Sequence, residues 1–130
     1  MADDNEPVRN AIRRLLKNDP EIQLLAEAIT FRQTMQIAAD LRPHVIVMDL
    51  HMGDEKNVTP TQVKSALAGS KLVAISIWND DESKALADNL GALLLLDKID
   101  LAADLIPAIK RCATNHSHID TRREDLRQAN

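Results

Sequence analysis

The segment His44-Val45-Ile46-Val47-Met48-Asp49 decides the fold, because it is an almost continuous apolar strand that ends in a carboxylate. A strand that is apolar on both faces is typical of a parallel sheet covered by helices on its two sides. Further short apolar runs occur at 22–28, 72–77 and 93–96, and stretches with apolar residues at helical spacing lie between them. This alternation predicts a doubly wound α/β fold, in which ligands bind at the carboxyl ends of the strands.

The composition is that of one folded domain. The chain has 130 residues, of which 45% are hydrophobic and 28% are charged, so it is too apolar for a disordered chain and short for a second core. A net charge of −4 argues against a broad nucleic-acid-binding surface, and a single cysteine excludes an intramolecular disulfide framework. The apolar runs are too short to span a bilayer, and no secretion signal opens the chain. We therefore expect a cytoplasmic location.

Polar side chains follow successive strands of the predicted sheet. Asp49 closes its strand, Ser76 lies near the end of the next, Lys98 follows the last, and Asp3 and Asp4 precede the first helix. Two carboxylates about 4 Å apart repel each other by about 4 kcal/mol at an effective dielectric constant of about 20. They persist together when a divalent cation bridges them, and oxygen ligands suit Mg²⁺. A lysine and a hydroxyl beside such a site are what a phosphoryl group needs.

With these residues the chain resembles the receiver domain of response regulators, the phosphorylated module of bacterial two-component signalling. The resemblance runs from residue 2 to about residue 113, and its matching stretches are 2–5, 42–52, 74–76 and 91–98. Residues 79–82 and 98–101 lean toward the subgroup whose output domain is a helix-turn-helix. The resemblance implies a flavodoxin-like, three-layer fold with strand order 2-1-3-4-5. It also implies a receiver domain over residues 1–115 and a polar tail or linker over residues 116–130.

The resemblance also implies a role for each site residue. Asp49 would be the phosphoacceptor for a sensor histidine kinase, and Ser76 and Lys98 would bind oxygens of the phosphoryl group. Mg²⁺ would be held by Asp3 through water and directly by Asp4, Asp49 and the backbone carbonyl of His51. Such a domain accepts and slowly loses a phosphoryl group and is not an enzyme in the ordinary sense. It would switch a partner or an output domain, a second copy of the chain is a candidate partner, and neither a membrane nor direct nucleic acid contact is implied.

The chain departs from this family pattern at its start. Only Met1 and Ala2 precede Asp3, whereas the family has an apolar strand there, in the middle of the sheet. Three explanations stay open: residues upstream of Met1 are missing from this sequence, another segment or a second chain fills the position, or the regulator is degenerate. A higher melting temperature for a chain extended upstream by an apolar strand would favour the first explanation, and an equal one would contradict it.

Smaller departures concern switching. Gly53 replaces a family proline and should loosen the loop after Asp49. Ile77 stands where the family has a small residue, and we expect it to screen the phosphoryl group. Leu95 occupies the position of an aromatic residue, so rotation of an aromatic ring cannot be the output signal. These departures keep a second function open, that of a pseudo-receiver acting as a phosphorylation-independent interaction module. An aspartyl-nucleophile phosphatase is disfavoured, because His51 stands where those enzymes carry their acid/base Asp.

Overall fold

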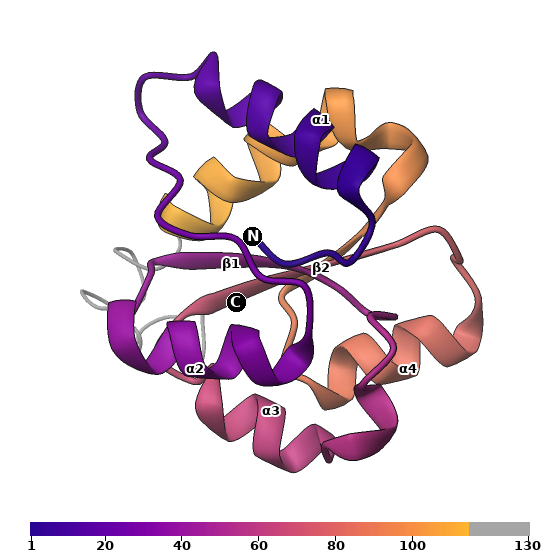
Figure 1. Ribbon diagram of the computed structural model, residues 1–130. Helices are drawn as coiled ribbons and strands as arrows, with labels where there is room; N and C mark the ends of the chain where they lie inside the picture. The colour runs from indigo at the N-terminus through magenta and orange to yellow at the C-terminus, as the bar shows by residue number, and fades with distance from the viewer. Residues whose placement is uncertain (115–130) are drawn as a thin grey trace, which may run out of the picture.

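The computed structural model describes residues 1–114, which form three layers with a parallel sheet in the middle (Figure 1). The sheet consists of β1 (Val45–Asp49), β2 (Lys71–Ser76) and β3 (Leu94–Asp97), which lie side by side in that order. Both pairings are parallel. The predicted α/β fold is confirmed, and each of these strands begins within one residue of its predicted start. The predicted boundary at residue 115 and the polar tail lie outside the described residues.

Helices cover both faces of the sheet (Figure 1). One face carries α1 (Glu6–Lys17) and a helix over residues 101–114, and the other carries α2 (Phe31–Leu41), α3 (Pro60–Ala66) and α4 (Asp81–Asn89). Neighbouring strand residues point to opposite layers: Val47 belongs to the core with α1, and Met48 belongs to the core with α2. Because both layers are apolar, a strand in this sheet must be apolar at every position.

Side chains and backbone geometry define the helix ends. The side-chain oxygen of Asn5 accepts a hydrogen bond from the N–H of Val8 at the start of α1. Thr59 and Gln62 form a reciprocal capping box at the start of α3. Helix α2 ends at Arg42, which adopts a left-handed conformation and donates its N–H to the carbonyl of Ala38. The proline that follows cannot continue the helix.

The first strand position is occupied only at its carboxyl end. Ala2 forms isolated parallel bridges to Ala28 on one side and to Met48 on the other. Its N–H donates to the carbonyl of Val47 at 2.8 Å, and its carbonyl accepts from the N–H of Asp49 at 2.9 Å. The expectation that the first strand is largely missing is therefore confirmed.

The prediction of a strand over residues 22–28 is wrong. Within residues 1–114, this segment pairs with the sheet only at Ala28, and the rest of it forms no strand. Its apolar pattern is that of a sheet strand, but a strand exists only where a neighbour takes up its backbone N–H and C=O groups. The shortened first strand removes that neighbour. The predicted order 2-1-3-4-5 is thus present with its first two positions reduced to bridges.

Candidate functional site

The carboxyl edge of the sheet gathers the polar side chains that the sequence predicts there. Asp3 follows the bridge residue Ala2, Asp49 ends β1, Ser76 ends β2, and Lys98 directly follows β3. Asp3, Asp49 and Ser76 are buried. Parallel strands that start at one edge of a sheet end together at the other, and this topology brings residues far apart in the sequence to one place.

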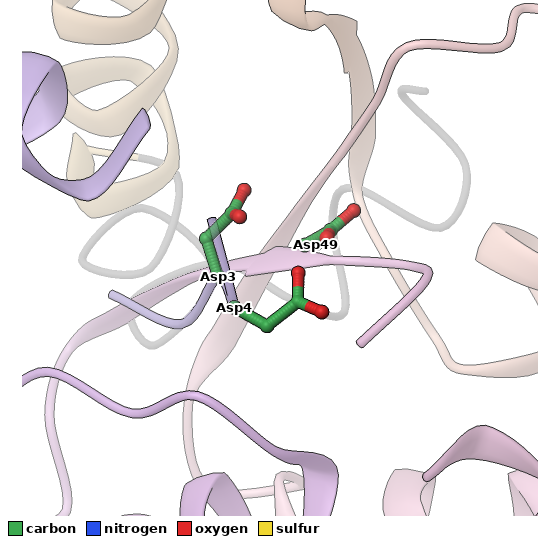
Figure 2. A group of neighbouring side chains, drawn as sticks. All are labelled: Asp3, Asp4 and Asp49. Carbon is green, nitrogen blue, oxygen red and sulfur yellow. The ribbon is translucent and has the colours of Figure 1, made fainter. Parts of the chain in front are cut away.

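Three carboxylates form the centre of the site (Figure 2). Asp3, Asp4 and Asp49 each offer one carboxylate oxygen, and these oxygens lie within 4.8 Å of one another. Asp3 and Asp49 are buried, whereas Asp4 is exposed. One Mg²⁺ with bonds of about 2.1 Å spans oxygens up to about 4.2 Å apart. The donor set therefore fits Mg²⁺ with at most a small movement of these side chains.

Lys98 supplies the positive charge next to the two buried carboxylates. Its Nζ lies 2.8 Å from Oδ2 of Asp3 and 3.3 Å from Oδ2 of Asp49. The lysine side chain is itself only 12% exposed. The ammonium pairs with two of the three clustered carboxylates, so the site keeps an excess of negative charge. This excess favours the binding of a cation.

The pKa of Asp49 reflects this environment. Burial raises it from 3.8 to about 6, and the neighbouring charge of Asp3 contributes to the rise. Lys98 and the backbone N–H of His51 act in the opposite direction and lower the pKa. Asp49 is therefore mostly ionised near pH 7.5, and its carboxylate is available as a nucleophile.

The position of Asp3 depends on contacts with the start of α1. The N–H of Asn5 donates to Oδ1 of Asp3 at 2.8 Å, and Nη1 of Arg9 donates to the backbone carbonyl of Asp3, also at 2.8 Å. Sequence reasoning missed Arg9. The sequence offers one indication of this contact: Arg9 lies one helical turn after the capping residue Asn5. From that position a long side chain can reach back to the segment that precedes the helix.

The loop after β1 connects the site to neighbouring elements. The N–H of His51 donates to Oδ1 of Asp49 at 3.3 Å. The imidazole ring of His51 packs edge-on against Trp78, with ring centroids 4.7 Å apart. Further along the loop, the carboxylate of Asp54 accepts from the N–H of Phe31 at the start of α2. This cap, which sequence reasoning missed, ties the loop to a neighbouring helix.

The remaining predicted residues lie at the end of β2 and on β3. The hydroxyl oxygen of Ser76 accepts from the N–H of Trp78 at 3.0 Å. Ile77 is 56% exposed beside it. Leu95 is partly buried and packs against the core on the side of α2, α3 and α4. Its side chain is a leucine on β3, so this position offers no aromatic ring that could rotate.

The chain is similar to curated bacterial response regulators, although no family model matches it. It is 28% identical over 123 residues to the transcriptional regulatory protein LiaR of Bacillus subtilis, which covers 94% of this chain and 58% of LiaR. It is 31% identical over 118 residues to the response regulator protein VraR of Staphylococcus saprophyticus, which covers 90% of this chain and 56% of VraR. The chain therefore spans little more than half the length of these relatives.

A different class of relative matches over a smaller part. A protein-glutamate methylesterase/protein-glutamine glutaminase of Shewanella denitrificans is 30% identical over 100 residues, which make up 75% of this chain and 26% of that protein. Sequences similar to this chain therefore also occur as part of a protein named as an enzyme. The match leaves out most of that protein.

Solved structures share the fold. The non-phosphorylated receiver domain of the stress response regulator RcsB from Escherichia coli superposes with a TM-score of 0.77 at 19% identity, over 88% of this chain and 90% of that one. The signal receiver domain of the putative response regulator NarL from Mycobacterium tuberculosis gives 0.76 at 19% identity, over 87% and 92%. Among residues 1–114, none of the helices has the length and apolar character needed to cross a membrane.

Proposed function

We propose that Asp49 of this chain, a response-regulator receiver domain with relatives of the LiaR and VraR type, accepts a phosphoryl group from a sensor histidine kinase. The observation that carries the proposal is the buried Asp49 carboxylate at the end of β1, with Lys98 and two further carboxylates around it. We further propose that the modified domain switches a partner or an output domain, and that it acts in the cytoplasm.

The transfer needs a nucleophile and partners for the transferred oxygens. A carboxylate oxygen of Asp49 forms the new P–O bond while the P–N bond to the kinase histidine breaks. Lys98, already within 3.3 Å of that carboxylate, pairs with a phosphoryl oxygen. The oxygen of Ser76 accepts from Trp78, which leaves the hydroxyl hydrogen to donate to a second phosphoryl oxygen. Catalysis by this chain then consists of positioning and charge stabilisation.

The acidic residues would hold Mg²⁺. The candidate ligands are Asp4, Asp49 and the backbone carbonyl of His51, with Asp3 acting through water. When bound, the cation neutralises negative charge on the transferring group. The chain's own contribution is the burial of Asp3 and Asp49, which keeps their oxygens poorly hydrated and therefore available to a cation. The domain would have no activity of its own beyond gaining and slowly losing the phosphoryl group.

Intact mass spectrometry tests the proposal directly. Wild type, Asp49→Asn and the exposed control Asp104→Asn are incubated with acetyl phosphate and Mg²⁺, and in parallel with EDTA. We expect the mass of one phosphoryl group on wild type and on Asp104→Asn when Mg²⁺ is present, and none on Asp49→Asn. No adduct on wild type would favour the pseudo-receiver, a function that the absence of an aromatic side chain at Leu95 also supports.

Ile77→Ala should shorten the lifetime of the phosphorylated form several-fold. Ile77 follows Ser76 directly and exposes 56% of its surface, so its removal opens a path for the water that hydrolyses the acyl phosphate. The loss of the adduct is followed over time by mass spectrometry, with Leu93→Ala, another exposed leucine-sized side chain at 46%, as the control. Equal lifetimes for Ile77→Ala and wild type would contradict a screening role.

A further inference from the structure

A ring contact joins the two segments that follow Asp49 and Ser76. The imidazole of His51, two residues after Asp49, packs edge-on against the indole of Trp78, with ring centroids 4.7 Å apart and ring planes at 74°. Trp78 itself lies two residues after Ser76, and Asp49 and Ser76 end the neighbouring strands β1 and β2. The contact therefore links the loop behind the nucleophile to the loop behind the hydroxyl.

The backbone of Trp78 holds the hydroxyl of Ser76. The N–H of Trp78 donates to Oγ of Ser76 at 3.0 Å, and Ser76 is buried. A free serine hydroxyl moves among three staggered rotamers, whereas an oxygen that accepts this bond keeps one of them, and its hydrogen is left to donate elsewhere. A donor that is fixed in advance stabilises a transferring group without having to reorganise. The place of the Trp78 N–H therefore matters for a phosphoryl group on Asp49.

The indole of Trp78 lies outside the apolar core. Trp78 is 51% exposed, and within residues 1–114 it belongs to neither of the two groups of packed apolar side chains. The loop around it is short, because β2 ends at Ser76 and Asp80 caps α4 by accepting from the N–H of Ser83 at 2.8 Å. Between these two fixed points, the ring contact with His51 anchors the loop.

His51 gives the indole a well-held surface. Its N–H donates to Oδ1 of Asp49 at 3.3 Å, and its Nδ1 lies 3.9 Å from Oε2 of Glu55. The other ring nitrogen, Nε2, is buried and has no hydrogen-bond partner in the described part of the chain. A buried nitrogen without a partner costs free energy, so hydrogen bonding of Nε2 does not explain where the ring lies. Packing against Trp78 does.

We propose that Trp78 is a positioning residue for phosphoryl transfer. Its indole, packed against His51, holds the loop after β2 so that its own N–H fixes the Ser76 hydroxyl for a phosphoryl group on Asp49. This inference rests on the proposed function of Asp49, and it adds a residue that acts through Ser76.

The rate at which the chain gains a phosphoryl group tests this role. Wild type, Trp78→Ala and Trp78→Phe are incubated with acetyl phosphate and Mg²⁺, and intact mass spectrometry gives the initial rate. We expect Trp78→Ala to react about fivefold more slowly, the factor that corresponds to an aromatic contact of ordinary strength. Trp78→Phe keeps a ring against His51 and should stay within about twofold of wild type. Leu93→Ala, which removes an exposed side chain before the start of β3, should react as wild type does.

Double variants show whether Trp78 acts through Ser76. Ser76→Ala removes the hydroxyl that the Trp78 N–H holds, so adding Trp78→Ala to it should slow the reaction no further. His51→Ala should slow the reaction as much as Trp78→Ala does, and the two together no more than either alone, because both remove the same contact. His51→Phe keeps a ring there and should react close to the wild-type rate.

Amide exchange measures the same contact without a phosphoryl group. In the absence of Mg²⁺, the N–H of Trp78 should exchange slowly in wild type, because it is bonded to Ser76. His51→Ala should speed this exchange several-fold, whereas Leu93→Ala should leave it unchanged. Urea unfolding of Trp78→Ala should give nearly the wild-type free energy, since the indole lies outside the core.

Three results would overturn the positioning role while leaving the proposed function intact. The first is a phosphoryl adduct that forms as fast on Trp78→Ala as on wild type. The second is a full additional loss of rate when Trp78→Ala is added to Ser76→Ala. The third is unchanged exchange of the Trp78 amide in His51→Ala. The absence of an adduct on wild type would instead overturn the proposed function, and the positioning role with it.

Discussion

Asp49→Asn should be more stable than the wild-type chain at pH 7.5 in EDTA, by about 2 to 3 kcal/mol. The pKa of Asp49 is raised from 3.8 to about 6 in the folded chain, chiefly by burial. The folded state therefore holds the Asp49 proton more tightly than the unfolded state. The full linkage value is about 3 kcal/mol, and relaxation of the surroundings of the buried charge lowers it somewhat.

The size of this effect depends on pH. Below pH 3.8 Asp49 is protonated in both states, and its contribution to stability is fully present. Stability is then lost as the pH rises through the folded pKa of about 6. Asparagine does not titrate, so the two free energies of unfolding should be nearly equal around pH 4 and diverge up to about pH 7.

Urea unfolding across this pH range in EDTA provides the measurement. Asp104→Asn, which alters an exposed carboxylate, should follow the wild-type curve at every pH. A difference between Asp49→Asn and wild type that stays constant with pH would contradict the burial of the charge. Addition of Mg²⁺ should raise the stability of wild type more than that of Asp49→Asn, because the cation binds the ionised carboxylate.

Lys98→Met should destabilise the metal-free chain by about 3 to 5 kcal/mol at pH 7.5, because it leaves two buried carboxylates without their counter-charge. The lysine Nζ lies 2.8 Å from Asp3 and 3.3 Å from Asp49. Methionine keeps most of the apolar stem and removes only the ammonium. Since Lys98 lowers the pKa of Asp49, its removal should raise that pKa further, and the loss of stability should grow as the pH rises.

A surface lysine supplies the matched control. Lys110 contacts Asp19 and Glu21 at 2.9 and 2.8 Å, but its side chain is 43% exposed. Lys110→Met should therefore have little effect on the free energy of unfolding in urea. Adding Asp49→Asn to Lys98→Met should recover part of the lost stability. Equal costs for Lys98→Met and Lys110→Met would show that the buried lysine does not hold the carboxylates together.

Most of the architecture could be predicted from local patterns. The continuous apolar segment around Val47 and the helical spacing between the strands are enough for a layered α/β fold, because a strand covered on both faces must be apolar throughout. The gathering of Asp3, Asp49, Ser76 and Lys98 at one edge follows from the topology alone. The resemblance to receiver domains, carried by the same residues, is confirmed by the comparisons. The roles of these residues in phosphoryl transfer stay predictions.

Local sequence patterns could not predict whether residues 22–28 form a strand, because that depends on a neighbouring segment. Residues 22–28 have the composition of a strand, but pairing is a property of two segments, and only Ala28 finds a partner. The capping of α2 by Asp54 and the contact of Arg9 with Asp3 likewise join residues whose approach depends on the whole fold.

The sequence by itself determined the layers, the direction of the strands and the edge at which the polar residues meet, since these follow from apolar periodicity and chain order. Only the tertiary structure decided that Lys98 lies next to both Asp3 and Asp49 and that the pKa of Asp49 rises to about 6. The physical reason is that burial and charge separation depend on distances between residues far apart in the chain, which periodicity does not contain.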